Sequence, residues 1–256
     1  MRLLYSIYEK RLLKTVERGL LPEHVGIILD GNRRFARERN LAQPDAIYEQ
    51  GARKLDEVLA WCGELGIGAV TLWVCSTDNL ARDSEEVSGI LNAVERKLEQ
   101  LANDPQIHGR RVRVRATGRL GLLPDSLVQA IKTVEAATSS HNSMTLTIAV
   151  AYGGREEIAD ALRALLEEEA RSGARLEEVA ARVTPDLIGR HMYLADLPDP
   201  DLIIRSSGEI RLSGFLLWQS PYSELYFSDV HWPAFRKIDF LRALRSYQQR
   251  RRRFGK

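Results

Sequence analysis

The sequence predicts a single α/β domain with a central parallel sheet and helices on both faces of that sheet. Short apolar runs alternate with longer stretches of helical periodicity, and this alternation is typical of parallel sheets. The chain has 256 residues, of which 44% are hydrophobic and 28% charged, as expected for one globular core. No repeat or break in composition marks a second folding unit.

The first 23 residues are predicted to be a helical extension, and residues 24–256 form the main domain. A helix over 2–19 is amphipathic, because apolar residues recur every four positions while basic residues occupy other faces. These apolar residues are Leu4, Tyr8, Leu12 and Val16. The pattern suits a helix docked on the domain, and it also suits weak contact with a membrane surface.

The main domain alternates between predicted strands and helices. The runs predicted to be buried strands are 25–29, 70–75, 112–115, 145–151 and 202–204. The stretches predicted to be helices are 46–65, 84–102, 125–138 and 155–171. From about residue 215 the chain is predicted to form a strand pair or a loop region, followed by a helix at 238–253.

Composition argues against several classes of protein. The net charge of +2 gives no reason to expect a nucleic-acid partner. Cys62 and Cys75 have neither the spacing of a zinc site nor the number for a disulfide framework, which predicts reduced core thiols. No segment has the roughly 20 continuous apolar residues of a membrane span, and the first residues lack signal-peptide features. We therefore expect a cytoplasmic protein.

Polar groups follow the first predicted strand, at the end where parallel sheets bind their ligands. The segment ILDGNRRFA at 28–36 places Asp30 and Gly31 before Arg33 and Arg34, at the predicted start of a helix. Glycine lets a ligand approach the backbone, arginines suit a phosphate, and Asp30 suits Mg2+. The alternative is an aspartate that caps the helix beside solvated arginines.

A second polar cluster follows the strand predicted at 70–75. It consists of Ser76, Thr77, Asp78 and Asn79, with Arg82 one turn further on. These side chains could bind an anion, but Ser, Asp and Asn also cap helices such as the one predicted at 84–102. This cluster alone does not separate the two interpretations.

The third cluster follows the strand predicted at 202–204. Arg205, Arg211 and Ser213 lie around a glycine-bearing turn, which suits a second anion site, and Glu224 follows after the apolar run 215–218. Two anion sites beside a magnesium carboxylate predict a reaction between two diphosphates. The P-loop, the H-x-x-x-H pair and the G-x-S-x-G elbow are all absent, which argues against an NTPase and a hydrolase.

These segments, in this order, resemble the signature regions of cis-prenyltransferases of the undecaprenyl diphosphate synthase type. The matching stretches are HVGIILDGNRRFA (24–36), STDN (76–79), AYGGREEI (151–158) and the segment 201–227. The resemblance runs from His24 to Gly255 and implies a parallel sheet wrapped by helices, an apolar tunnel for the growing chain, and a homodimer. It implies condensation of isopentenyl diphosphate with an allylic diphosphate, geranyl or farnesyl, to give a new Z double bond.

The resemblance also implies roles for individual residues. Asp30 would bind Mg2+ and assist departure of the allylic diphosphate, while Glu224 would reach the metal from across the dimer interface. The allylic diphosphate would be held by Gly31, Asn32, Arg33, Arg34 and Phe35. Isopentenyl diphosphate would be held by Arg205, Arg211 and Ser213, near Asp78 and Arg82. Ser76 and Asn79 would assist proton removal.

The chain departs from the family pattern at several of these positions. Phe35 and Leu80 each stand where the family usually has Trp, and Asp78 stands in place of Glu. Tyr48 and Ile210 each replace a His, and the stretch around 43–44 replaces a preceding Arg. The departures concern contacts to the allylic diphosphate and details of proton transfer.

The departures and the N-terminal extension look closest to actinobacterial short-chain enzymes such as Z,E-farnesyl diphosphate synthase. The helix expected along the tunnel carries Glu95, Arg96, Lys97 and Glu99, which is polar for a long lipid channel. Small residues near the expected floor, Cys75 and Ala149, favour instead a long polyprenyl product. We expect the short product, with a long-chain synthase as the alternative.

Two further classes are weighed against an enzyme. The family fold also serves as a non-catalytic subunit, but retention of Asp30, Asn79, Arg205 and Glu224 argues against that role. A nucleic-acid binder would use the arginines between 110 and 115 or the run 250–253. Arginines that alternate along a strand are more simply one solvated face.

Overall fold

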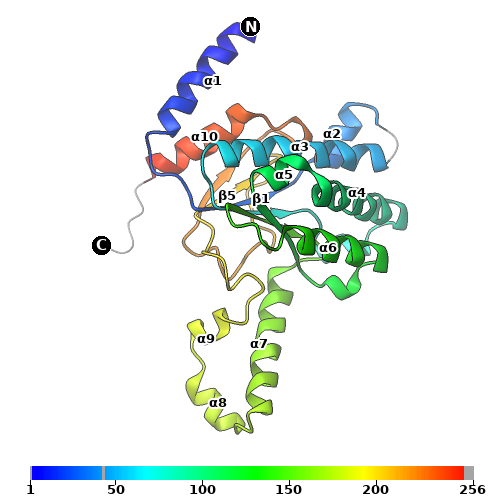
Figure 1. Cartoon of the computed structure of the whole chain (residues 1–256), viewed down its shortest axis with the longest axis vertical. Coiled ribbons are helices and arrows are strands. Elements are labelled where there is room, and N and C mark those ends of the chain that lie inside the picture. Colours follow the sequence, from blue (N-terminus) through cyan, green and yellow to red (C-terminus); the bar gives the residue numbers. More distant parts are fainter. Residues whose placement is uncertain (1, 42–43, 251–256) are drawn as a thin grey trace.

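The computed structural model describes residues 2–41 and 44–250, and these form one central sheet with six parallel strands. The strand order is β3–β4–β2–β1–β5–β6. The strands are β1 (His24–Ile28), β2 (Ala69–Trp73), β3 (Val112–Thr117), β4 (Met144–Ala149), β5 (Leu202–Arg205) and β6 (Glu224–Phe227). The predicted parallel α/β architecture is confirmed (Figure 1).

The helices agree closely with the sequence pattern. Five of them begin and end within a few residues of the predicted stretches: α1 (Arg2–Val16), α3 (Pro44–Glu64), α4 (Ser84–Asn103), α6 (Asp125–Thr138) and α7 (Gly154–Arg171). Near the end of the chain lies α10 (Lys237–Gln249); residues 251–253 of the predicted helix lie outside the described residues. The short helices are α2 (Asn32–Glu38), α5 (Pro105–Gly109), α8 (Leu176–Arg182) and α9 (Pro185–Gly189).

The region after residue 215 follows the loop alternative of its prediction as far as residue 223 and then adds one strand. It does not form a strand pair: β6 is a single strand that extends the parallel sheet at its edge, beside β5. Alternation in ELYF is too short to distinguish a hairpin from one added strand. The register pairs Leu202 with Glu224 and Arg205 with Phe227, so Glu224 lies at the amino end of the sheet.

The central strands are buried on both faces, which explains why they are continuously apolar. Ile27 and Leu72 belong to the larger core, to which α3, α4, α6 and α10 also contribute. Ile28 and Trp73 point the other way, into a smaller cluster closed by Phe215. The Trp73 and Phe215 rings stack there with centroids 5.4 Å apart.

The N-terminal helix docks on the C-terminal one. Leu12 and Val16 are buried, and Gln248 Nε2 donates to the carbonyls of Val16 and Leu20 at 2.8 and 3.1 Å. Tyr8 is partly exposed and accepts a hydrogen bond from Arg245 at 3.3 Å. The side chain of Leu4 lies outside the described residues. No helix among residues 2–41 and 44–250 has the length and apolarity needed to span a bilayer.

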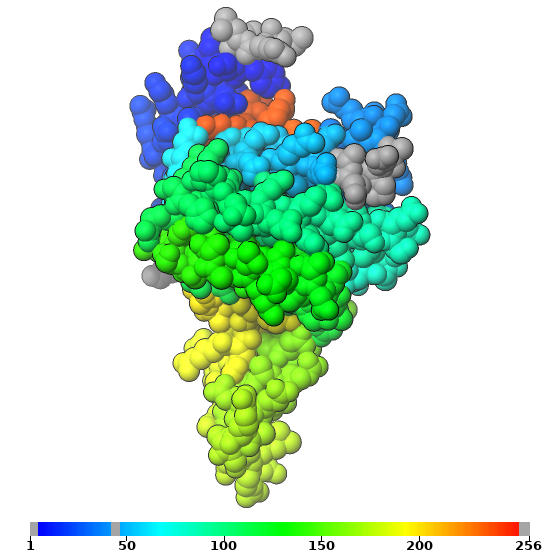
Figure 2. All heavy atoms as spheres, turned by 45° about the vertical axis from the view of Figure 1, so that its right-hand side comes forward, coloured from blue at the N-terminus to red at the C-terminus, as the bar shows by residue number. Residues whose placement is uncertain are grey.

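Helices α7, α8 and α9 form an arm that projects from the body of the molecule (Figures 1 and 2). The arm begins beside the smaller core cluster, where the Gly154 N–H donates to the Gly214 carbonyl at 2.9 Å. Its surface carries exposed apolar side chains: Leu162, Leu166, Leu176 and Val183. Exposed apolar groups gathered on one projecting segment are typical of an interaction surface.

Candidate active site

The three polar clusters meet in one pocket. Strands β2, β1 and β5 are neighbours in the sheet, so the segments that follow them leave from the same edge. They line a cavity of about 620 Å³. Six arginines contribute to it, Arg33, Arg34, Arg37, Arg82, Arg205 and Arg211, against three acidic residues, Asp30, Asp78 and Glu209. A concave site with this excess of positive charge suits a polyanionic ligand.

Arg205 and Asp30 form the centre of the pocket. Arg205 Nη2 donates to Asp30 Oδ2 at 2.8 Å, and its Nη1 donates to Ser213 Oγ at 2.7 Å and to the Arg211 carbonyl at 2.5 Å. The Arg205 side chain is only 6% exposed, whereas Asp30 keeps 27% of its surface in contact with solvent. One buried guanidinium group therefore joins the segments that follow β1 and β5.

Asp30 is held in its ionised form. Partial burial by itself raises the pKa of this carboxyl, but the hydrogen bonds and charge of Arg205 outweigh burial and hold the pKa below its ordinary value. Arg34 adds a weaker contact to Asp30 Oδ1 at 3.4 Å. An ionised carboxylate at a positively charged pocket is the kind of oxygen ligand that Mg2+ takes together with phosphate oxygens.

Glu209 connects the two outer arginines of the pocket. Its carboxylate accepts from Arg34 Nη1 at 3.2 Å and also pairs with Arg211. All three side chains are substantially exposed, so these ion pairs are weak and open to exchange. A bound anion could take the place of Glu209 between these two guanidinium groups.

The segment that follows β2 is held in place by a reciprocal pair of hydrogen bonds. The Ser76 N–H donates to Asn79 Oδ1 at 3.1 Å, and the Asn79 N–H donates to Ser76 Oγ at 3.1 Å. Both side chains line the pocket. Within this arrangement the Ser76 hydroxyl hydrogen and the Asn79 amide hydrogens remain as potential donors toward a ligand.

Tyr48 lies where the polar pocket meets an apolar cavity. Its hydroxyl donates to Glu86 Oε1 at 3.0 Å, and the same oxygen accepts from Arg82 Nη1 at 2.7 Å. Arg33 approaches that oxygen at 3.5 Å. Burial and then the Glu86 charge raise the pKa of Tyr48, so the phenol keeps its proton. Glu86 therefore gathers two pocket arginines beside a neutral tyrosine.

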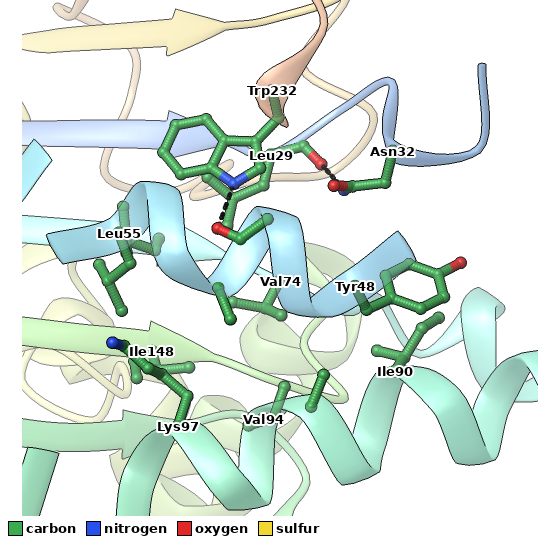
Figure 3. Close-up of a pocket in the computed structure, with 14 residues that line it drawn as sticks. Leu29, Asn32, Tyr48, Leu55, Val74, Ile90, Val94, Lys97, Ile148 and Trp232 are labelled. Carbon is green, nitrogen blue, oxygen red and sulfur yellow. Dashed lines mark hydrogen bonds between the residues drawn. The ribbon is translucent and has the colours of Figure 1, made fainter. Parts of the chain in front are cut away.

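The apolar cavity, of about 60 Å³, lies between α3, α4 and the sheet (Figure 3). It shares Leu29, Asn32, Tyr48, Val74 and Ile90 with the polar pocket, so the two spaces are adjacent. Its other lining residues are Gly51, Ala52, Leu55, Leu72, Ala93, Val94, Lys97, Ile148 and Trp232. Asn32 Oδ1 is buried at this junction without a hydrogen-bond partner among the described residues, which leaves an acceptor for a ligand.

Comparison with known proteins decides the family. A family model described as "putative undecaprenyl diphosphate synthase" matches residues 28–255. The chain belongs to this family of cis-prenyltransferases. The resemblance stated from the motifs is confirmed.

Individual relatives and a solved structure agree with this assignment of the cis-prenyltransferase family. An isoprenyl transferase of Deinococcus radiodurans is 56% identical over 250 residues, covering 97% of this chain and 91% of the relative. A (2Z,6E)-farnesyl diphosphate synthase of Thermobifida fusca is 52% identical over 252 residues, covering 98% and 97%. Lavandulyl diphosphate synthase from Lavandula x intermedia, crystallised with dimethylallyl diphosphate, matches with a TM-score of 0.83 and 32% identity, covering 92% of this chain and 99% of that chain.

Most of the residues predicted for the cis-prenyltransferase site lie together. The pocket contains Asp30, Gly31, Asn32, Arg33, Arg34, Ser76, Asp78, Asn79, Arg82, Arg205, Arg211 and Ser213. Gly31 has a left-handed φ of 96°, and an added Cβ would lie 2.6 Å from His231 Nδ1. The glycine is thus required by packing between the first strand end and the segment after β6, as well as by any approach of a ligand.

Two predicted residues do not reach the pocket. Phe35 lies outside the pocket lining, under the Arg39 guanidinium at 5.4 Å from the ring centroid. Glu224 lies at the opposite end of the sheet from Arg205 and pairs with Arg250 at 2.8 Å. Within one chain, Glu224 is therefore not a ligand of a metal at Asp30.

Sequence reasoning missed other pocket residues of this cis-prenyltransferase. Arg37 follows Arg33 by one helical turn on α2, and that spacing was a usable signal. Glu209 lies within the SSGEIR turn, but its position between two arginines depends on the turn conformation. Glu86, from the first turn of α4, does not line the pocket but pairs with two arginines that do, and its sequence position was indistinguishable from that of a solvated helix residue.

Proposed function

We propose that this cis-prenyltransferase condenses isopentenyl diphosphate with an allylic diphosphate, geranyl or farnesyl, in a Mg2+-dependent reaction that forms a Z double bond. The proposed product is short, such as Z,E-farnesyl diphosphate. The observation that carries this proposal is one positively charged pocket, centred on Asp30 and Arg205, beside an apolar cavity. Such a pair of spaces suits two diphosphates, one of which carries a prenyl chain.

The allylic diphosphate is assigned to the segment that follows β1. Arg33 and Arg34 offer guanidinium donors there, and Asn32, whose Nδ2 already donates to the Leu29 carbonyl, borders the apolar cavity that would take the prenyl chain. Isopentenyl diphosphate is assigned to Arg205, Arg211 and Ser213. In this arrangement the two diphosphates would lie on either side of Asp30, and the pocket arginines offset their combined charge.

Magnesium is assigned to Asp30. The carboxylate is ionised and partly exposed, and Mg2+ is usually held by one or two carboxylates together with phosphate oxygens. Among the described residues no group of three or more His, Cys, Asp or Glu side chains forms a metal cage, which fits a metal that arrives with its diphosphate. When bound, the metal would neutralise charge on the departing diphosphate.

The residues of the chain then supply positioning and charge. The bond between the allylic carbon and its diphosphate oxygen breaks, and a new carbon–carbon bond joins that carbon to the isopentenyl unit, which loses a proton. The pocket arginines stabilise the negative charge that develops on the leaving diphosphate. Ser76 and Asn79 line the same pocket, and their proposed role is to orient the isopentenyl unit and assist removal of its proton.

The small apolar cavity supports the short product. The apolar cavity has to enlarge to take any prenyl chain, and a short chain requires the smaller rearrangement of its walls. The T. fusca relative carries the name of a short-chain synthase, whereas the family description names a long-chain one. A long-chain polyprenyl diphosphate synthase is therefore kept as the alternative.

A homodimer is proposed on the arm formed by α7 to α9. Leu162 and Leu166 on α7, with Leu176 and Val183 nearby in the chain, leave apolar surface for a second copy. Glu224 on the edge strand β6 reaches a metal only if the partner subunit presents its own pocket to that strand.

Light scattering of the purified protein is expected to give twice the mass of 29.0 kDa. A monomer at assay concentration would contradict both the dimer and the role of Glu224.

Incubation with labelled isopentenyl diphosphate and Mg2+ tests the reaction and its product. Separate reactions contain geranyl diphosphate or farnesyl diphosphate as the primer. One control adds a chelator and another omits the primer. The products are dephosphorylated and sized by chromatography. We expect one short product from geranyl diphosphate, abolished by the chelator. A ladder of long products would support the long-chain alternative, and no condensation with any primer would support a non-catalytic family member.

A further inference from the structure

Lys97 lies at the end of the apolar cavity that is furthest from the polar pocket. Figure 3 shows it on α4 beside Leu55 and Ile148, while Asn32 and Tyr48 mark the opposite end. The side chain is only 8% exposed. A nearly buried lysine in a cavity lined mainly by aliphatic side chains is unusual and requires a partner for its charge.

That partner is Asp56 on α3. Lys97 Nζ donates to Asp56 Oδ1 at 2.5 Å, and half of the Asp56 side chain is exposed. The ammonium group is therefore held toward the outer edge of the contact between α3 and α4. The methylene stem of Lys97 stays behind it, against the cavity wall.

The ion pair makes this end of the cavity hard to open. An apolar side chain in place of Lys97 could rotate aside when a prenyl chain pressed against it. Displacing the Lys97 stem from the cavity wall would strain or break the ion pair with Asp56, and breaking it would leave a nearly buried ammonium group without this partner. An end wall held by this ion pair is therefore harder to displace than one formed by an unpaired aliphatic side chain.

We propose that Lys97, anchored by Asp56, closes the far end of the prenyl cavity and limits the number of isoprene units in the product. The proposal rests on the proposed function and specifies the residue that sets its product length. A chain that grows from the pocket at Asp30 toward α4 would stop when its first-formed end meets the Lys97 stem.

Product length in three variants tests the proposal. Lys97→Ala removes the wall, and Asp56→Ala removes the anchor. Because Asp56→Ala leaves the charge of the nearly buried Lys97 without this partner, thermal unfolding is measured to check that the variant folds. Lys54→Ala is the matched control: Lys54 is a largely buried lysine on α3, 12% exposed and paired with Glu57 at 2.8 Å, and it is not part of the cavity lining. Each variant is assayed with geranyl diphosphate and labelled isopentenyl diphosphate.

The main product of Lys97→Ala is expected to be at least one isoprene unit longer than that of the unmodified protein. Asp56→Ala should shift the product in the same direction, Lys54→Ala should not, and the KM for isopentenyl diphosphate should be unchanged in all three. An active Lys97→Ala variant with the unmodified product length would overturn the inference alone. Absence of condensation by the unmodified protein would refute the proposed function and this inference with it.

Discussion

Replacement of Asp30 by Asn is expected to lower kcat by roughly 10³-fold, the scale seen when a group that stabilises developing charge is removed. The amide can still accept a hydrogen bond from Arg205, so the centre of the pocket keeps its shape. It cannot supply the negative charge that a metal–diphosphate complex needs. Steady-state condensation rates at saturating Mg2+ measure the effect, and thermal unfolding checks the fold.

The matched control for this substitution is Asp78→Asn. Asp78 lines the same pocket, yet Arg205 pairs with Asp30 and not with Asp78. We expect the control to lose much less activity. Equal losses from the two substitutions would show that overall pocket charge matters more than the position of Asp30, and an undiminished rate in Asp30→Asn would refute the proposed metal site.

The pH dependence of stability is expected to change with the same substitution. Because the folded-state pKa of Asp30 is depressed, its contribution to stability is present above the unfolded-state pKa and is lost as pH falls through the folded-state pKa. The Asp30→Asn variant should therefore lose less stability than the unmodified protein on acidification. The comparison uses urea unfolding at neutral and acidic pH.

Arg205→Lys is expected to lower kcat/KM for isopentenyl diphosphate by about 10²-fold or more. The guanidinium donates to Asp30, Ser213 and the Arg211 carbonyl from three separate nitrogen positions. A lysine ammonium is a single point charge that cannot maintain this fork. The loss should appear mainly as a raised KM together with a weaker response to Mg2+, because both the anion site and Asp30 are displaced.

Arg211→Lys serves as the comparison for Arg205→Lys. The Arg211 side chain is 59% exposed and pairs with Glu209, so a lysine at this position can still approach an anion from solvent. A several-fold rise in KM is expected, well below the effect at Arg205. If Arg205→Lys were as active as Arg211→Lys, Arg205 could not be the residue that joins the two anion sites.

The fold and most of the site could be predicted from short-range patterns. Continuous apolar runs predicted the central strands because both faces of those strands are covered, and the rule for parallel sheets then directed attention to Asp30, Ser76 and Arg205. The arginine-rich strand face was also confirmed, since β3 alternates buried valines with exposed or half-exposed arginines. Arg115 on that strand pairs with Asp196 at 2.6 Å.

What could not be predicted depends on long-range geometry. The register between β5 and β6 places Glu224 beside Leu202. The four residues ELYF alone do not specify which strand they pair with or in which direction. The direction of Phe35 depends on where α2 begins, at Asn32, and a shift of one residue would turn its ring elsewhere. From the sequence, Lys97 is only a polar residue of its helix. Its partner Asp56 is 41 positions away in the sequence and lies on a different helix, so no local pattern predicts the pair.

The geometry of the new double bond tests the central claim most directly. Unmodified protein is incubated with geranyl diphosphate, isopentenyl diphosphate and Mg2+, and the dephosphorylated product is compared by NMR and chromatography with authentic Z and E alcohols. We predict that the bond formed in the reaction is Z. An E bond, or no condensation with any allylic diphosphate, would contradict the function assigned to the pocket around Asp30 and Arg205.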